Sequence, residues 1–508
     1  MTDQATTARS GTGTAGFDRR LVPPMMLGSV LNPINSTIIA VALVPIGNAF
    51  GAPPSQTAWL VSALYLATAL GQPVVGRLID LFGPRRLFLL STGLVGVAGV
   101  VGAVAPGLGV LIAARVLLGF GTCAGYPAAM ALLRSEAKRT GQDSPAGVLT
   151  TLAVANQTIA VAGPLLGGLL IGVGGWRATF ALNIPLAAAA VVLGALRLPR
   201  QPRTQAPGES TPGEGGSEEG GSDGEGAGGG GGGVAARIDL PGMALFAAML
   251  FSLLLFLMNL HADTWYLPAI TVAAGSGFAL RELRARTPFI DLRVLGGNPP
   301  LLATYGRALV AYVVSYAFLY GFTQWTEEGY GLSPFHAGLV QIPMFLVGIA
   351  VSVTVGRRPG VLGKLLLGAV GQIAACVLML TLGAASPVWM LVALAVVFGI
   401  PQGANSLALQ NSVYFQSDPE RTGSSAGLLR TFAYLGSMIA SSATAASFGQ
   451  RAGTAGMHRL AWIMLGAGVL YLLITVFDRS LRRLPPDRTG AARGQSPARR
   501  LPHHPRTQ

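Results

Sequence analysis

The sequence predicts an all-α integral membrane protein with fourteen transmembrane helices, arranged as two pseudo-symmetric six-helix bundles with two further helices inserted between them. Three observations lead to this fold class: the composition, the length of the apolar segments and an internal repeat. Hydrophobic residues make up 51% of the 508 residues, charged residues make up only 11%, and the mean hydropathy is +0.54. A soluble chain of this length would carry far more charge.

Each predicted helix is an apolar segment of about 20 residues, which is the length needed to cross the hydrocarbon core of a bilayer. The first six segments begin near Leu21, Thr57, Arg86, Leu108, Gly147 and Ala178. The other eight begin near Leu240, Trp265, Pro300, Phe335, Val361, Pro387, Ser425 and His458.

These segments divide the chain into blocks. The expected blocks are an N-terminal tail (1–20), a first bundle (21–198), a linker (199–236), two inserted helices with a basic connection (237–298), a second bundle (299–481) and a C-terminal tail (482–508). The linker is acidic and rich in glycine, and the C-terminal tail is basic, so both are expected to be disordered on the cytoplasmic side.

The net charge of +14 is explained by where the arginines lie along the chain. The arginines fall in alternate gaps between apolar segments, for example at Arg85 and Arg86, instead of gathering on one face. By the positive-inside rule these gaps and both termini are cytoplasmic, in a multi-pass protein of the cytoplasmic (inner) membrane. A nucleic-acid partner is therefore not expected.

The third observation is an internal repeat at an offset of 280 residues. Pairs of matching residues at this offset include Gly76 with Gly356, Gly119 with Gly399, and residues 146–151 with 426–431. A constant offset across several helices indicates two parallel copies of one unit. Such repeats place a substrate site at their interface, near the middle of the bilayer.

No enzyme site is expected. The two cysteines, Cys123 and Cys376, lie inside apolar segments, which argues against a disulfide framework and a metal site. The glycine run at 228–233 lacks the Gly-Lys-Ser/Thr of a phosphate-binding loop, and no nucleophile elbow or zinc-protease motif is present. No cofactor is expected, and a proton gradient is the expected energy source.

Three motifs carry a family resemblance. The polar turn Gly76-Arg-Leu-Ile-Asp80-Leu-Phe-Gly83-Pro-Arg85-Arg86 separates two apolar segments, Arg115 lies within the segment Leu111-Ile-Ala-Ala-Arg-Val-Leu-Leu-Gly119, and Gly163-Pro164-Leu-Leu-Gly167-Gly168 lies in the fifth helix. Together they resemble the signature loop, the arginine motif and the antiporter motif of the major facilitator superfamily. Nearly the whole chain resembles its fourteen-helix drug:proton antiporter branch.

The resemblance implies roles for these residues. Gly76, Asp80, Gly83, Arg85 and Arg86 would form a conformational motif, in which Asp80 caps a helix near residues 424–427 and locks the outward-facing state. A surface salt bridge of Asp80 with a neighbouring arginine is the alternative. Gly163 and Pro164 would kink the fifth helix, while Gly167 and Gly168 would allow close helix approach; ordinary packing is the alternative.

The first helix departs from the family pattern. The family usually has an aspartate where this chain has Asn35, which cannot titrate, so that proton site is missing. In relatives, the residue corresponding to Arg115 is thought to act with that acid. The candidates for coupling or substrate binding are Arg115, Asn35, Gln157, Arg307, Gln324, Glu327 and Arg430.

Charge suggests how these candidates act. Arg115, Arg307 and Arg430 are deep enough to line a positive central cavity, which would favour anionic substrates. Glu327, next to Glu328, can bind a proton if the two carboxylates are close, or can lie in a solvated loop.

The expected function is secondary active export of small molecules such as drugs, antibiotics or secondary metabolites, by proton antiport and alternating access. The alternatives are an uncoupled facilitator or uptake carrier for a polar metabolite, and a non-transporting membrane sensor. The expected partners are a small-molecule substrate, protons and the lipid bilayer, with a monomeric chain.

Overall fold

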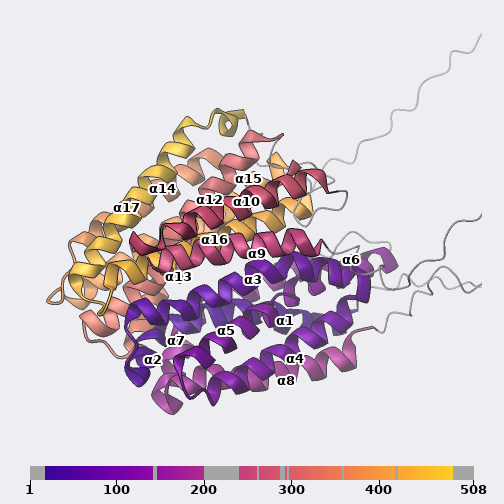
Figure 1. Ribbon diagram of the computed structural model, residues 1–508, viewed down its shortest axis with the longest axis horizontal. Helices are drawn as coiled ribbons and strands as arrows, with labels where there is room; N and C mark the ends of the chain where they lie inside the picture. The colour runs from indigo at the N-terminus through magenta and orange to yellow at the C-terminus, as the bar shows by residue number, and fades with distance from the viewer. Residues whose placement is uncertain are drawn as a thin grey trace, which may run out of the picture.

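The computed structural model describes residues 18–140, 146–199, 239–259, 262–285, 292–293, 297–356, 360–417 and 422–483. These residues form helices and short connections, with no β-strand among them (Figure 1). The acidic linker predicted at 199–236 and the two predicted tails lie almost wholly outside the described residues.

The described residues of the first bundle form eight α-helices and two short 3₁₀ helices. They are η1 (Arg19–Leu21) with α1 (Val22–Ile38), η2 (Ile39–Val41) with α2 (Leu43–Phe50), α3 (Pro54–Phe82), α4 (Pro84–Ala103), α5 (Leu108–Thr122), α6 (Gly125–Thr140), α7 (Ala146–Ala181) and α8 (Asn183–Arg197). Local sequence sets several boundaries. Proline occupies the first turn of α3 and α4, where its missing N–H costs nothing. Gly83 separates these two helices at a φ of 84°, which a glycine adopts without strain.

The remaining helices follow the same plan. The inserted pair is α9 (Leu240–Met258) and, after η4 (Ala262–Thr264), α10 (Tyr266–Arg284). The second bundle consists of α12 (Pro299–Ala317) with the π-helical η5 (Phe318–Phe322) and η6 (Trp325–Gly329), α13 (Pro334–Gly356), α14 (Val361–Leu380), α15 (Val388–Gln416), α16 (Thr422–Phe448), α17 (Thr454–Phe477) and η8 (Arg479–Arg483).

A helix begins within a few residues of nearly every predicted start. The sixth segment is the exception, because a break at Gly174 and Gly175 lies inside α7 and the helix restarts at Asn183. Within the described residues, ten helices are long and apolar enough to cross a bilayer, or eleven if the 45° bent pair Ala162–Ala181 and Asn183–Arg197 is one span. The count of fourteen spans therefore stays a prediction.

The two bundles repeat one packing pattern. In the first bundle α1 packs on α7, α3 on α5, and α4 on both α5 and α8. In the second bundle the corresponding pairs are α12 on α16, α13 on α15, and α14 on both α15 and α17. The pseudo-symmetry predicted from the repeat is thus confirmed, whereas the exact domain boundaries stay predictions.

Two pairs of helices join the bundles: α3 packs on α16, and α7 packs on α13 (Figure 1). The inserted helix α9 packs on both α3 and α16, so it lies along one side of this junction. Asp239 accepts hydrogen bonds from the Gly242 amide (3.0 Å) and from Arg281 (2.8 Å), which caps α9 and ties it to α10.

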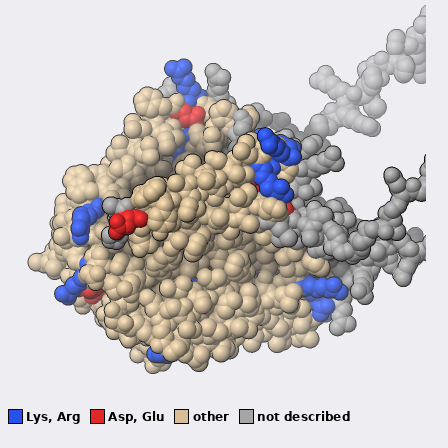
Figure 2. Space-filling model, viewed as in Figure 1, with Lys and Arg blue, Asp and Glu red and all other residues tan. Residues whose placement is uncertain are grey.

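We call the end of the molecule where α1 begins and α17 finishes the terminal end, and the opposite end, where α2 finishes and α17 begins, the distal end. On the face shown in Figure 2, the charged side chains lie toward the ends of the helices and leave a broad uncharged surface between them. Exposed apolar side chains such as Leu196, Val173 and Trp462 are consistent with a lipid-facing surface.

The junction of α1 and α6 depends on a glycine. A Cβ atom at Gly125 would overlap the backbone carbonyl of Gly28, which cannot move without shifting α1. We predict that Gly125→Ala destabilises the protein by about 2 kcal/mol through overpacking. Thermal unfolding in detergent tests this. The matched control is Gly109→Ala in α5, where a Cβ would meet open space. Equal midpoints for the two variants would contradict the prediction.

Candidate functional site

Arg115 of α5 is buried and is held by backbone carbonyl groups. Its side chain is only 2% exposed; Nε donates to the Leu60 carbonyl oxygen of α3 (2.8 Å) and Nη1 donates to the Asn35 carbonyl oxygen of α1 (3.1 Å). Nη2 is buried without a hydrogen-bond partner. The guanidinium group therefore ties three helices of the first bundle together at mid-depth, and carbonyl dipoles serve it instead of an acid.

Asn35 forms a reciprocal amide pair with Asn183 of α8. Its Nδ2 donates to Asn183 Oδ1 (2.7 Å), and Asn183 Nδ2 donates to Asn35 Oδ1 (3.0 Å). An aspartate at position 35 would lack the first of these donors. Asn35 thus stands where the resemblance implies an acid. It cannot titrate, and both hydrogen bonds of its amide pair with Asn183 are formed.

Five tyrosines form a column where the bundles meet, and we call Tyr65, Tyr312, Tyr316, Tyr320 and Tyr434 the tyrosine column. The hydroxyl groups of Tyr65 (α3) and Tyr320 (η5) lie 2.9 Å apart, and Tyr320 donates to the Ser36 carbonyl oxygen (3.0 Å). Tyr65 stacks on Tyr434 (5.8 Å between centroids) and meets Tyr316 edge-on (5.3 Å). Tyr316 also stacks on Tyr312 and Tyr320. The column therefore joins α3 of one bundle to α12 and α16 of the other.

The sequence analysis missed this column. One signal was present, since Tyr312, Tyr316 and Tyr320 recur every four residues and so share one helix face. Nothing in the sequence showed that this face meets Tyr65.

Arg430 lies at the terminal side of the column. Its guanidinium carbon is 4.0 Å from the ring centroid of Tyr126, which begins α6 in the opposite bundle. Arg430, Tyr126, Tyr312 and Tyr316 are partly exposed, whereas Tyr65 and Tyr320 are buried. We call these four partly exposed residues, which come from both bundles, the Arg430 site.

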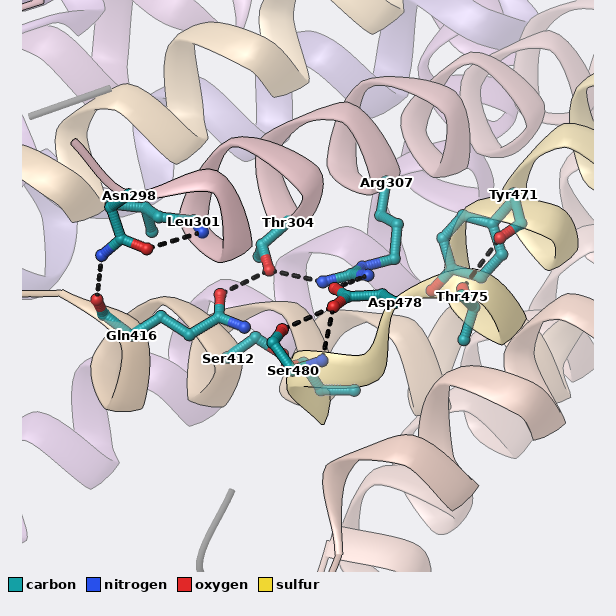
Figure 3. Close-up of polar contacts among 11 residues, drawn as sticks. Asn298, Leu301, Thr304, Arg307, Ser412, Gln416, Tyr471, Thr475, Asp478 and Ser480 are labelled. Carbon is teal, nitrogen blue, oxygen red and sulfur yellow. Dashed lines mark hydrogen bonds and ion pairs between the residues drawn. The ribbon is translucent and has the colours of Figure 1, made fainter. Parts of the chain in front are cut away.

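Arg307 lies elsewhere (Figure 3). It is fully buried inside the second bundle, where Nη1 donates to Asp478 (2.7 Å) and Nη2 donates to Thr304 (2.6 Å). Thr304 in turn donates to Gln416 (2.6 Å), so the network joins α12, α15 and the end of α17. The expected cavity of three arginines is therefore not assembled: Arg307 is neutralised and Arg115 is enclosed.

Gln324, Glu327 and Glu328 all lie at the distal end of the molecule. A cavity of about 290 Å³ lies between α2, the turn at 51–53, the start of α3 and the region of η6, and Gln324 and Glu328 are among its lining residues. Glu328 accepts a hydrogen bond from the Ala452 amide (3.0 Å) and pairs with Arg451 (3.5 Å). Glu327 is 8% exposed, and neither of its carboxyl oxygens has a hydrogen-bond partner. The adjacent acids thus occupy unlike environments.

Hydrogen bonds between the bundles close the distal side. Ser55 donates its amide to the Gly449 carbonyl oxygen (3.3 Å), and Ser441 donates to the Ala58 carbonyl oxygen (2.9 Å). The Tyr65–Tyr320 contact lies further in. Together these contacts separate the distal cavity from the Arg430 site.

The antiporter motif lies where three helices meet. Gly163, Pro164, Gly167 and Gly168 are all buried. Added Cβ atoms at Gly163 and Gly167 would overlap α1 and η2, and one at Gly168 would lie 2.5 Å from the Phe335 Cα of α13. The motif therefore lets α7 pack closely against α1 and η2 of its own bundle and against α13 of the second bundle.

The conformational motif is described only in part. Gly83 ends α3, Arg85 donates to the Ala195 carbonyl oxygen of α8 (2.8 Å), and Arg86 is exposed, while Gly76 faces open space. The side chains of Asp80 and Gln157 lie outside the described part of the structure. The helix-capping role of Asp80 therefore stays a prediction.

A family model decides the identity. The model of the Major Facilitator Superfamily matches residues 25–441. The chain belongs to the major facilitator superfamily. Members of this superfamily are membrane transporters and not enzymes, so the predicted family and the predicted absence of an enzymatic role are both confirmed.

Similar proteins support this assignment. The chain is 30% identical over 463 residues to an uncharacterized transporter of this superfamily, YwoD of Bacillus subtilis, covering 88% of this chain and 94% of YwoD. It is 29% identical over 378 residues to the tetracenomycin C resistance and export protein of Streptomyces glaucescens, covering 70% of this chain and 63% of that protein. The crystal structure of the nucleoside transporter NupG shares the fold, with a TM-score of 0.57, 10% identity, and coverage of 90% of this chain and 98% of NupG.

The Arg307–Asp478 pair leads to a stability prediction. Burial alone would raise the pKa of Asp478, but hydrogen bonds from Ser480 and from Arg307 outweigh it and hold that pKa below its ordinary value. Asp478→Asn leaves a buried guanidinium without its counter-charge, so we expect a loss of about 3 kcal/mol at pH 7. The exposed Asp263, changed to Asn, is the matched control for thermal unfolding.

The pH dependence has a definite sign. A lowered pKa stabilises the folded protein above the unfolded-state pKa of about 4, and this stabilisation is lost as the pH falls toward the folded-state value. The unfolding midpoints of the parent and of Asp478→Asn should therefore differ at pH 7 and converge below about pH 4. A constant difference across this range would contradict the assignment.

Proposed function

We propose that this chain exports a small molecule across the cytoplasmic membrane in exchange for protons, by alternating access of a central site between the two bundles. Membership of the transporter superfamily supports the transport class. Resistance and export proteins among the similar chains, those for tetracenomycin C and for lincomycin, support export as the direction.

The observation that carries proton coupling is the state of Glu327. Both carboxyl oxygens are buried without a partner, at 8% exposure of the residue. Burying an unpaired carboxylate costs far more free energy than burying the neutral acid, so a proton is expected on Glu327 in the closed arrangement described above. Release of that proton then requires a change in surroundings, which is the requirement for a coupling residue.

The position of Glu327 links it to the central site. The α12 segment, which comprises α12, η5 and η6 (residues 299–329), runs from the Arg430 site to the distal end. In this order it carries Tyr312, Tyr316, Tyr320, Gln324 and Glu327. Its helical register is shifted by two π-helical turns, a feature often found at functional positions. A rotation or straightening of this segment would move the tyrosine column and Glu327 together.

The arginine distribution supports an orientation with the terminal end in the cytoplasm. With the distal side closed, the Arg430 site then faces the cytoplasm, as an exporter requires for loading. Access from the other side needs the Ser55–Gly449, Ser441–Ala58 and Tyr65–Tyr320 contacts to break while the terminal ends approach each other. Asp80 would then meet the start of α16 and hold the second state.

The test uses proteoliposomes and a panel of cationic and anionic dyes and antibiotics. For a compound that the parent chain exports, Glu327→Gln mimics the protonated acid, so we expect at least a tenfold loss of transport driven by a pH gradient. Exchange of labelled for unlabelled compound, which needs no net proton movement, should persist.

The matched control is Asp263→Asn, an exposed distal acid, which should keep gradient-driven transport. Full gradient-driven transport by Glu327→Gln would reject this residue as the proton carrier. Loss of both transport and exchange would indicate a structural role for Glu327.

A second function, uncoupled facilitation, is favoured by one observation. The position that usually holds an acid in the first helix is Asn35, locked to Asn183 by two hydrogen bonds. In that case flux would follow the substrate gradient alone and would not change when a protonophore is added. Flux that stops with the protonophore would exclude this function.

A further inference from the structure

We infer that the Arg430 site selects anionic aromatic molecules, such as aromatic carboxylates or phenolates. This inference rests on the proposed transport function and specifies the class of substrate. It comes from three features: a cation with no acid opposite it, exposed tyrosine rings beside it, and the enclosure of the other deep arginines.

Arg430 is a cation without a counter-ion among the described residues. The ion pairs formed there are Arg281–Asp239, Arg307–Asp478 and Arg451–Glu328. The guanidinium group instead lies over the Tyr126 ring, 4.0 Å from its centroid, and forms a side-chain hydrogen bond with Tyr434.

A charge in this position selects by sign. A cationic ligand would meet Arg430 at close range and would be repelled by its like charge. An anion would provide the missing counter-charge and accept charge-assisted hydrogen bonds from the guanidinium group. Arg115 and Arg307 are enclosed, so Arg430 is the one of the three candidate arginines whose charge can act on a ligand in this site.

The rings add a preference for planar ligands. The rings of Tyr312 and Tyr316 stack on one another with their centroids 6.0 Å apart and their planes at 25°, and both residues are partly exposed. Tyr312 is close enough to Arg430 to interact with its charge. An aromatic ligand can contact the exposed parts of these rings edge-on or in an offset stack, a contact that a ligand without a ring cannot make. An aliphatic anion would keep the ionic contact with Arg430 but would lack the ring contacts.

The experiment measures binding to the purified full-length chain in nanodiscs, without any gradient. The probes are 2-naphthoate, its neutral carboxamide, the matched naphthylmethylammonium cation and the aliphatic anion decanoate. We expect 2-naphthoate to bind at least tenfold more tightly than each of the other three. Arg430→Gln should abolish the preference for naphthoate over the carboxamide, and Arg430→Lys should keep part of it.

Two further variants separate the ring contribution from folding. Tyr316→Leu should weaken naphthoate binding more than decanoate binding, whereas Arg459→Gln, an exposed cation on α17, should change neither. Tighter binding of the cation, equal binding of all probes, no binding of naphthoate at millimolar concentration, or an unchanged preference in Arg430→Gln would each overturn the inference. The proposed function fails separately, when no compound of the dye and antibiotic panel is transported.

Discussion

The structure depends on one constraint: a polar group buried at membrane depth must find its partner inside the protein. Arg115 meets it through backbone carbonyl groups, Asn35 through Asn183, Arg307 through Asp478, and Tyr65 through Tyr320. Each of these contacts joins helices that are distant in sequence. The hydrogen-bonded pairs therefore act as the specific connections in a fold whose apolar packing alone has little preference for one helix arrangement over another.

Glu327, near the distal cavity, and Arg430, where the bundles meet, do not follow this pattern. Glu327 has no partner for either carboxyl oxygen, and Arg430 has an aromatic ring in place of an acid. Unsatisfied or incompletely satisfied groups are costly, so their presence indicates a role in which the partner comes and goes. A proton and an anionic ligand are partners of that kind, and the α12 segment and the tyrosine column connect the two positions.

The junction between the bundles is built for separation. It uses small residues such as Gly168 and Gly338, which let α7 and α13 approach closely without interlocking side chains. In its few hydrogen bonds, the acceptor is a backbone carbonyl oxygen or both groups are hydroxyls. No ion pair between described residues crosses this junction. Inside the second bundle, by contrast, the buried charged network of Arg307 with Asp478 ties α12, α15 and the end of α17 together.

The sequence by itself determined the helical membrane class, nearly all of the helix starts, the repeat and the family, because apolar length, glycine and proline positions and the polar turn after α3 are local properties. It also identified Arg115, Glu327 and Arg430 as groups that need an explanation. Only the tertiary structure decided which of them are neutralised. The reason is physical: Asp478 lies 171 residues from Arg307, and Tyr126 lies on the opposite bundle from Arg430, so the free energy of each group depends on contacts that local sequence does not encode.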